Sequence, residues 1–405
     1  MNPAFPPLPP SPPAAPALRL RAGWLVDGSG VPPRKDVLLA IAGGRIASIE
    51  ELPPDRPVPD GSLDCGGCTV TPGLIDSHVH LTMTATRDEA CRNRQRQAPF
   101  DVVGRTIRDH LDDHLRHGVV AVRDGGGCRG NVARWVRERS GHPVGVRAAG
   151  RAWHRAGRYG RLIGRAVPDG LSLAEAIAAD PDPGDHVKIV NSGLNSLTEY
   201  GRRTAPQFGL EELRAAVQAA AARGRDVMVH ANGEEPVRVA VMAGCRSIEH
   251  GFFMGQENLA RMAERGTVWV PTAVTMQAYA DQLALAGRDP GAARRTLDHQ
   301  LAQLATARKL GVTVALGTDA GTPGVDHGAA VMREMHLLAQ AGFTFTEAVR
   351  CAAVNAALLV GGGSGLLAVG RPATFALHAA DPDGIPRRAG TVRAVFIDGV
   401  PVLRD

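Results

Sequence analysis

Cysteines, aromatic residues, lysines and long apolar runs are all scarce in this chain of 405 residues. Its six cysteines are few for this length and suit a reducing compartment. Aromatic residues make up 4% of the chain, and its basic residues are scattered, so the net charge of +5 does not indicate nucleic-acid binding. No apolar run approaches the roughly 20 residues that span a bilayer. We therefore expect a cytoplasmic protein with no nucleic-acid or membrane partner.

The N-terminal residues 1–16 are dominated by Pro and Ala and lack the basic and apolar segments of a secretion signal. They predict a disordered lead-in. Cys65 and Cys68 have the spacing of a zinc knuckle, but no second pair follows them. We interpret these two residues as incidental thiols.

Two kinds of pattern divide the rest of the chain. Residues 17–70 contain short strand patterns, with a hairpin around Gly43 and Gly44, and strand patterns return over residues 366–405. Between them, residues 71–365 alternate short apolar runs with amphipathic helix patterns. Eight strand candidates in this alternation predict an α/β fold, a (β/α)8 TIM barrel, flanked by a small β-sandwich built from the N- and C-terminal segments. A doubly wound open sheet is the alternative. The eight candidates are Leu74–His80, Val119–Arg123, Val144–Ala149, Val187–Val190, Val227–His230, Ser247–His250, Val268–Pro271 and Val312–Gly317.

A pair of histidines, His78 and His80, ends the first of these strands. Side chains alternate along a strand, so two residues one position apart project from the same face. Neutral imidazole is the commonest metal ligand. The pair by itself is compatible with two exposed histidines of no special role, or with half of a metal site.

Other strand ends supply the rest of a site. His230 ends the fifth strand, His250 the sixth and Asp319 the eighth. Active sites of barrels lie at the C-terminal ends of their strands, so these groups should converge on one mouth.

Lys188 lies within the fourth strand and is one of only three lysines in the chain. Its neighbours Val187 and Ile189 indicate a buried strand, where a bare ammonium is costly. Burial lowers the pKa of a lysine and favours the neutral amine. A neutral amine can react with carbon dioxide to form a carbamate, which can bridge two metal ions. The alternative is a lysine whose ammonium reaches the solvent at the strand end.

Taken together, these motifs resemble those of the amidohydrolase superfamily, and most closely its imidazolonepropionase-like branch, which includes metal-dependent Xaa-Pro and Xaa-Arg dipeptidases. The similarity runs from about residue 17 to 403 and rests on the joint order of short motifs. The motifs lie at residues 71–81, 118–125, 187–189, 229–231, 248–251, 317–320 and 347–357.

The resemblance implies a hydrolase of carbon–nitrogen bonds in amides or peptide-like molecules, with a dipeptidase and an N-acyl amino acid hydrolase as the expected types. It implies two divalent metal ions, with zinc as the default and manganese or iron as alternatives. His78, His80 and Asp319 would bind one ion, and His230 and His250 the other. Lys188, carboxylated by carbon dioxide, would bridge the two ions together with a hydroxide. That hydroxide would attack the carbonyl, and Asp319 would pass its proton to the leaving amine.

Substrate contacts are expected from loops near the mouth. His154, Arg155 and Tyr159 follow the third strand, and Arg155, Arg158, Tyr159 and Arg129 are candidates for clamping an acidic substrate group. Asn232 stands two residues after the fifth-strand ligand, where dipeptidases of this branch commonly have His or Tyr. We expect Asn232 to contact substrate, yet its identity disfavours the usual way of holding a dipeptide carboxylate.

Three alternatives remain open from the sequence. A mononuclear ring deaminase of the superfamily generally has Glu three residues after the fifth-strand histidine, where this chain has Gly233. A cyclic-amide hydrolase and a non-catalytic barrel are the others. His110, His114 and His117 predict a surface helix rather than a second metal site, and His327 begins a later helix. A homo-oligomer is compatible with the sequence.

Overall fold

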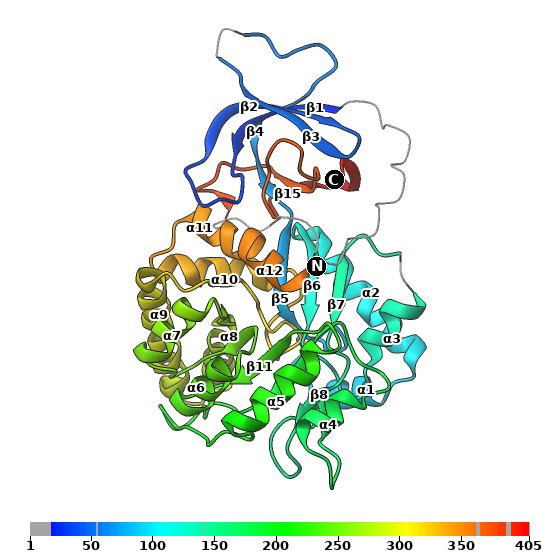
Figure 1. The fold of residues 1–405 in the computed structure, drawn as a ribbon. Helices are drawn as coiled ribbons and strands as arrows, with labels where there is room; N and C mark the ends of the chain where they lie inside the picture. The colour runs from blue at the N-terminus through cyan, green and yellow to red at the C-terminus, as the bar shows by residue number, and fades with distance from the viewer. Residues whose placement is uncertain (1–17, 54–55, 140, 362–364, 386–389, 405) are drawn as a thin grey trace, which may run out of the picture.

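The computed structural model describes residues 18–53, 56–139, 141–361, 365–385 and 390–404. The predicted lead-in over residues 1–16 lies outside this range. A small sheet stands above a larger barrel, and β4 continues from one into the other (Figure 1).

The two ends of the chain form one seven-stranded sheet, in the order β16-β15-β14-β4-β1-β2-β3. Its neighbours are antiparallel except β1 and β4, which pair in parallel. Gly43 (φ 56°) and Gly44 (φ 76°) make the predicted hairpin turn between β2 and β3, where positive φ favours glycine. The strands are β1 (Leu18–Leu25), β2 (Arg34–Ala42), β3 (Arg45–Glu51), β4 (Leu63–Pro72), β14 (Phe375–His378), β15 (Val392–Ile397) and β16 (Val400–Arg404).

The larger domain is built on parallel strands in two sheets, ordered β5-β6-β7 and β13-β12-β11-β10-β8-β9. These strands are short, and β5, β10, β11 and β12 are buried along their whole length, as expected where helices cover a parallel sheet. They are β5 (Leu74–Val79), β6 (Val119–Asp124), β7 (Gly145–Ala148), β8 (Ala152–His154), β9 (Gly164–Ala166), β10 (Val187–Val190), β11 (Val227–Ala231), β12 (Ser247–His250) and β13 (Val268–Val270).

The eighth predicted strand is an extended segment with irregular pairing, and it closes the ring. Trp269 N donates to the Thr313 carbonyl at 2.9 Å, and Ala315 N donates to the Trp269 carbonyl at 2.8 Å. On the other side, Ser77 N donates to the Leu316 carbonyl at 2.9 Å. Because this segment pairs with both β13 and β5, the barrel is closed, which confirms the predicted fold class.

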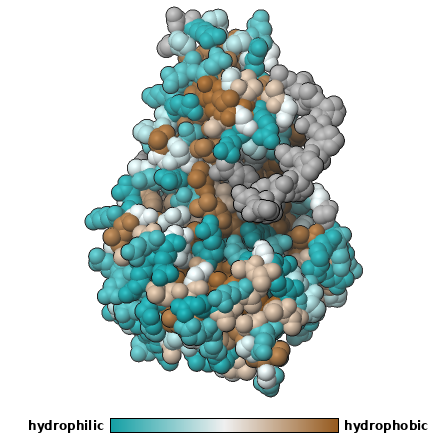
Figure 2. All heavy atoms as spheres, in the orientation of Figure 1, coloured by the Kyte–Doolittle hydropathy of each residue, from teal (hydrophilic) through white to brown (hydrophobic). Residues whose placement is uncertain are grey.

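Helices surround the strands on the outside (Figure 1). On the face shown in Figure 2, hydrophilic residues cover most of the barrel's outer helices. Among the described residues, no helix is long and apolar enough to cross a bilayer. The helices are α1 (Glu89–Gln97), α2 (Phe100–Arg116), α3 (Asn131–Glu138), α4 (Leu173–Ala178), α5 (Leu210–Ala221), α6 (Glu234–Ala243), α7 (Gln256–Arg265), α8 (Val274–Leu285), α9 (Gly291–Leu310), α10 (Ala329–Gln340), α11 (Phe345–Arg350), the π-helix η1 (Cys351–Asn355) and α12 (Ala356–Val360).

Candidate metal centre

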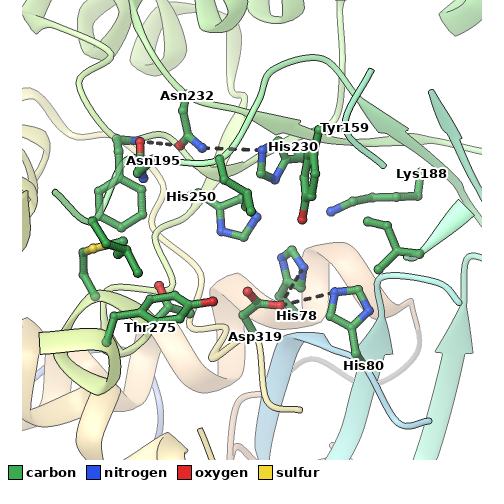
Figure 3. A pocket seen from close by; sticks show the side chains of 16 residues that line it. His78, His80, Tyr159, Lys188, Asn195, His230, Asn232, His250, Thr275 and Asp319 are labelled. Atoms are coloured by element: carbon green, nitrogen blue, oxygen red, sulfur yellow. Dashed lines mark hydrogen bonds and ion pairs between the residues drawn. The ribbon is translucent and has the colours of Figure 1, made fainter. Parts of the chain in front are cut away.

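Four histidine rings converge at the C-terminal ends of β5, β11 and β12 (Figure 3). The ring centroids of His78 and His250 lie 5.0 Å apart, and those of His230 and His250 lie 4.6 Å apart. Asp319 joins them, with its Oδ1 3.2 Å from His80 Nε2 and 3.6 Å from His78 Nε2. Ligand atoms of His78, His80 and Asp319 all lie within 4.8 Å of one another, which is close enough to hold one metal ion.

Each of the four rings has one nitrogen bonded to the surrounding protein and the other turned toward the pocket, where His80 Nε2 meets Asp319 Oδ1 at 3.2 Å. A ring nitrogen that donates to an acceptor carries the hydrogen, so the opposite nitrogen presents a lone pair. The anchors are Glu249 Oε2 for His78 Nδ1 (2.7 Å), the Gly126 carbonyl for His80 Nδ1 (2.9 Å), the Gly193 carbonyl for His230 Nε2 (3.2 Å) and Thr272 Oγ1 for His250 Nδ1 (2.7 Å).

The charge states suit metal binding at neutral pH. Burial lowers the pKa of His78 to about 4 and that of His230 to about 3, so both rings are in the neutral, ligating form. Burial alone would raise the pKa of Asp319, but the hydrogen bond from His80 and the nearby His78 outweigh it and hold that pKa well below its usual range. Burial alone would lower the pKa of His80, but its hydrogen bond to Asp319 outweighs burial and raises that pKa. The pocket therefore presents the neutral rings of His78 and His230 beside a charged carboxylate.

Lys188 on β10 is buried at 1% exposure, and its Nζ has no hydrogen-bond partner among the described residues. Figure 3 shows this amine pointing toward the histidines. Burial lowers the pKa of Lys188 to about 8. Packing alone does not explain why an amine without a hydrogen-bond partner lies beside a cluster of possible metal ligands.

A buried ion pair below the site holds His78 in place. Arg123 Nη2 donates to Glu249 Oε1 at 2.7 Å, and the Ser247 hydroxyl donates to the same oxygen. Although burial favours the protonated acid, Arg123 and His78 hold the pKa of Glu249 well below its usual range. The other Glu249 oxygen is thus a charged acceptor for His78 Nδ1–H, which fixes the tautomer that leaves Nε2 free.

The sequence analysis assigned no role to Glu249 or Arg123. Both are charged residues inside short buried strands, and this is the same signal that identified Lys188.

The backbone around the site is strained and closely packed. His250 (φ 68°), Thr272 (φ 47°) and Asp319 (φ 59°) are in the left-handed region although none is glycine. A Cβ on Gly125 would lie 2.9 Å from His80 Cε1 and 3.1 Å from His78 Nε2. Glycine at position 125 therefore leaves the space that both rings occupy.

The known proteins that this chain resembles agree with this geometry. The sequence profile of the Amidohydrolase family matches residues 69–402. The chain belongs to the amidohydrolase family. It is therefore a hydrolase, which confirms the enzyme class expected from the sequence.

Three relatives illustrate the similarity. The chain is 26% identical to ochratoxinase of Aspergillus niger over 379 residues, covering 84% of this chain and 76% of that protein. It is 28% identical to imidazolonepropionase of Mycolicibacterium smegmatis over 401 residues, covering 91% and 92%. Among solved structures, a Xaa-Pro dipeptidase with methionine bound in its active site superposes with a TM-score of 0.77 at 25% identity, covering 95% of this chain and 99% of the other.

Above the ligands, this amidohydrolase has a cavity of about 690 Å³ measured up to its open mouth. Tyr159 and Asn232, both expected to contact substrate, line it. Asn232 Oδ1 accepts from Phe252 N at 3.0 Å, so this oxygen is occupied by the protein. Asn232 Nδ2 lies 3.5 Å from His230 Nε2. Because His230 Nε2 carries the hydrogen that it donates to the Gly193 carbonyl, it cannot accept a hydrogen bond from the Asn232 amide, and the two groups are only in contact.

The other residues expected at the substrate do not line this cavity. His154 Nδ1 lies 2.9 Å from the Arg155 carbonyl, and Arg155 pairs with Glu212 at 2.7 Å. Arg158 donates to the Ala205 carbonyl at 2.9 Å. Arg129 Nη1 lies 3.3 Å from the Ala98 carbonyl. These side chains are engaged with the protein rather than aimed at the pocket.

A second histidine cluster corrects the prediction of a surface role for His110 and His114. Both are buried on the inner side of α2, His114 at 0% exposure. The rings of His110 and His327 stack with centroids 3.9 Å apart, and His114 Nε2 lies 3.3 Å from His327 Nδ1. His110 Nδ1 and His327 Nε2 reach the carbonyls of Leu81 and Met83, both at 2.9 Å, so the cluster supports the loop that follows His80.

Proposed function

We propose that this amidohydrolase hydrolyses a carbon–nitrogen bond in a small amide or peptide-like molecule, using two divalent metal ions. The observation that carries the proposal is the set of four histidines, each with one nitrogen anchored to the protein and the other facing the pocket, around an unpaired lysine and a charged aspartate. Zinc suits such a nitrogen-rich donor set, with manganese or iron as alternatives.

In this proposal the ligands divide into two groups. His78, His80 and Asp319 hold one ion, supported by the mutual proximity of their ligand atoms. His230 and His250 hold the other, since their rings adjoin each other and the first group. Bound ions would polarise the amide carbonyl and lower the pKa of a water molecule.

Lys188 is proposed to carry a carbamate that lies between the two groups. Its neutral amine nitrogen attacks the carbon of carbon dioxide and loses a proton, giving an anionic oxygen donor. The unpaired Nζ and its pKa of about 8 support this assignment. A carbamate would also replace an unpaired buried amine by a group whose oxygens have cationic partners.

Two side chains are proposed to act on the substrate. Asp319 accepts a proton from the attacking water and delivers it to the leaving amine nitrogen. Tyr159 directs its hydroxyl into the site from above His78 (Figure 3). Burial raises the pKa of Tyr159, so the hydroxyl stays protonated and can donate a hydrogen bond to the carbonyl oxygen as negative charge develops there.

The names of the relatives support hydrolysis and leave two amide types. The Xaa-Pro dipeptidase supports a linear, peptide-like bond. The similarity to imidazolonepropionase favours a cyclic-amide hydrolase as the second candidate. The alignment with imidazolonepropionase covers 91% of this chain, compared with 84% for ochratoxinase.

Metal content and product analysis test the proposal. Protein purified with metal retained should contain about two ions per chain and release an amine from linear amides. About one ion together with release of ammonia from a ring would instead indicate a deaminase. Bound metal with no turnover of amides, esters or lactams would indicate a non-catalytic barrel.

Lys188→Ala gives a second test with its own control. The variant should lose activity, and added formate or propionate should restore part of it by supplying a carboxylate in the vacated space. Lys309→Ala, at the exposed end of α9, is the matched control and should retain activity. Full activity in Lys188→Ala would contradict the carbamate.

We also propose a cytoplasmic location, because all six cysteines are free thiols, as in a reducing compartment. Size measurement in solution would decide whether the chain forms a homo-oligomer.

A further inference from the structure

The outer half of the pocket differs in chemistry from the metal-ligand half. We call it the outer wall, and it consists of Leu194, Leu197, Phe252, Met276 and Tyr279. Phe252 and Met276 pack with Leu197 and Tyr279 in one hydrophobic cluster. The wall is therefore the surface of a packed apolar layer rather than a few isolated side chains.

One residue of the wall lacks cover. Leu194 stands at the pocket with 57% of its surface exposed. A ligand group seated in the pocket would cover this side chain. Burying this leucine and the neighbouring apolar surface favours binding of a hydrophobic group.

Among the described residues that line the pocket, Lys188 is the only lysine or arginine, and it lies at the metal-ligand end, where we propose that it carries a carbamate rather than a positive charge. The arginines of the surrounding loops are engaged elsewhere. Arg155 pairs with Glu212, and Arg203 pairs with Glu234 at 3.0 Å. Arg158 is bonded to the Ala205 carbonyl.

A carboxylate placed against the outer wall would thus lose its hydration without gaining a cationic partner. The polar groups at the wall, which are Asn195, Thr275 and the Tyr279 hydroxyl, are neutral, since burial raises the pKa of Tyr279 to about 12. Thr275 Oγ1 donates to the Thr272 carbonyl at 2.8 Å, so its hydrogen is already used. The negative charge of Asp319 would also repel a nearby anion.

We propose that the substrate is an amide that is uncharged at the end filling the outer wall, and that this end is an aromatic or branched apolar group. This inference rests on the hydrolysis proposed above. It separates the chain from enzymes that take dipeptides or N-acyl amino acids with a free carboxylate at this position.

Matched pairs of substrates that differ by one carboxylate test the proposal. N-acetylphenethylamine and N-acetylphenylalanine differ on the amine side. Hexanoyl anilide and the monoanilide of adipic acid differ on the acyl side. With metal-loaded full-length protein, the neutral member of a hydrolysed pair should have a kcat/KM roughly tenfold or more above that of the anionic member. Equal or faster hydrolysis of an anionic member in either pair would overturn the inference.

A charge introduced at the rim sharpens the test. Leu194→Arg should raise the kcat/KM ratio of anionic to neutral substrate by about fivefold or more relative to Leu194→Gln. Leu194→Gln is the matched control, since it is polar and of similar length but uncharged. Because Leu194 is largely exposed, both variants should fold, which circular dichroism would check. An unchanged ratio in Leu194→Arg would contradict the placement of the substrate group against this wall.

Equilibrium binding separates this inference from the proposed hydrolysis. 4-Phenylbutanohydroxamic acid and its ring para-carboxylate would be titrated calorimetrically into metal-loaded protein. Tighter binding of the neutral compound without turnover of any amide supports the substrate class and refutes the hydrolysis. Turnover with equal or tighter binding of the carboxylate refutes the substrate class and leaves the hydrolysis standing. Binding of neither compound refutes both.

Discussion

The two halves of the pocket are built by opposite means. At the inner half, each histidine is fixed by a hydrogen bond between its ring and a barrel strand or its following loop, and the histidines are buried. The outer wall consists of apolar side chains from loops and α8, and Leu194 there is largely exposed. Rigid polar groups suit chemistry that requires a set geometry, whereas an apolar wall discriminates by size and charge. Changes in the inner half should therefore lower kcat, and changes in the outer wall should raise KM.

The largest effect is expected from Asp319→Asn. Asn tolerates the left-handed φ of 59° at this position, so the fold should survive while proton transfer is lost. We expect kcat to fall by about 10³-fold, within the range for removal of a general base or acid. Steady-state kinetics at matched metal content would measure the loss, and near-normal rates would show that Asp319 does not carry the proton.

Glu249→Gln should weaken the inner half without touching the pocket. The Gln amide would present N–H to His78 Nδ1, so the ring would place its own hydrogen on Nε2 and lose its free ligand nitrogen. We expect metal affinity to fall by about 10–100-fold, measured by competition with a chelator. Glu257→Gln, which removes the carboxylate of an exposed pair with Arg261, is the control. Equal metal affinity in Glu249→Gln and Glu257→Gln would show that Glu249 does not help His78 to bind metal.

Leu194→Ala probes the outer wall. Loss of part of one apolar contact should raise KM for a neutral amide by about fivefold and leave kcat within about twofold, since a few methylene groups correspond to 1–3 kcal/mol. Leu285→Ala, at 76% exposure and outside the pocket lining, serves as the comparison. A fall in kcat with unchanged KM in Leu194→Ala would show that the outer wall affects the chemical step rather than substrate binding.

The last prediction concerns stability rather than activity, and it involves the histidine cluster behind the inner half. Burial lowers the pKa of His114 to about 3, so the folded protein keeps it neutral while the unfolded chain takes up a proton below pH 6.5. Its contribution to stability is therefore complete above pH 6.5 and is lost progressively as the pH falls toward 3. When the pH falls from 7.5 to 5.5, the unfolding free energy of the wild type should fall. The fall should be smaller by about 1.4 kcal/mol in His114→Leu, which has no imidazole at this position to protonate on unfolding.

Urea unfolding at the two pH values would measure this difference. His336→Leu, on the exposed side of α10, is the control for replacing a histidine. The same pH dependence in wild type and His114→Leu would show that His114 is not kept neutral by burial.

Much of the inner half could be predicted from the chain alone. The period of a strand puts His78 and His80 on one face, and a buried strand makes Lys188 conspicuous. The alternation of strands and helices then predicts where His230, His250 and Asp319 meet. These inferences succeed because they depend on local periodicity and on one architectural rule of barrels.

Other features depend on partners far apart in the sequence. Arg123 and Glu249 meet across the barrel interior, 126 positions apart. His110 and His114 become buried because His327, from another segment, packs against them. The strand context marks Arg123 and Glu249 as unusual, but only the fold shows that they pair with each other. Composition could not separate His110 and His114 from histidines on a surface.

The sequence determined the barrel, the small sheet and the residues available to bind metal, because strand period and the order of elements are local properties. Only the tertiary structure decided which nitrogen of each histidine is free and which arginines are already paired. The reason is physical: hydrogen-bond partners and hydration depend on the positions of atoms from distant segments. The arginines near the mouth could have bound an acidic substrate until the fold paired Arg155 with Glu212 and left an apolar wall in their place.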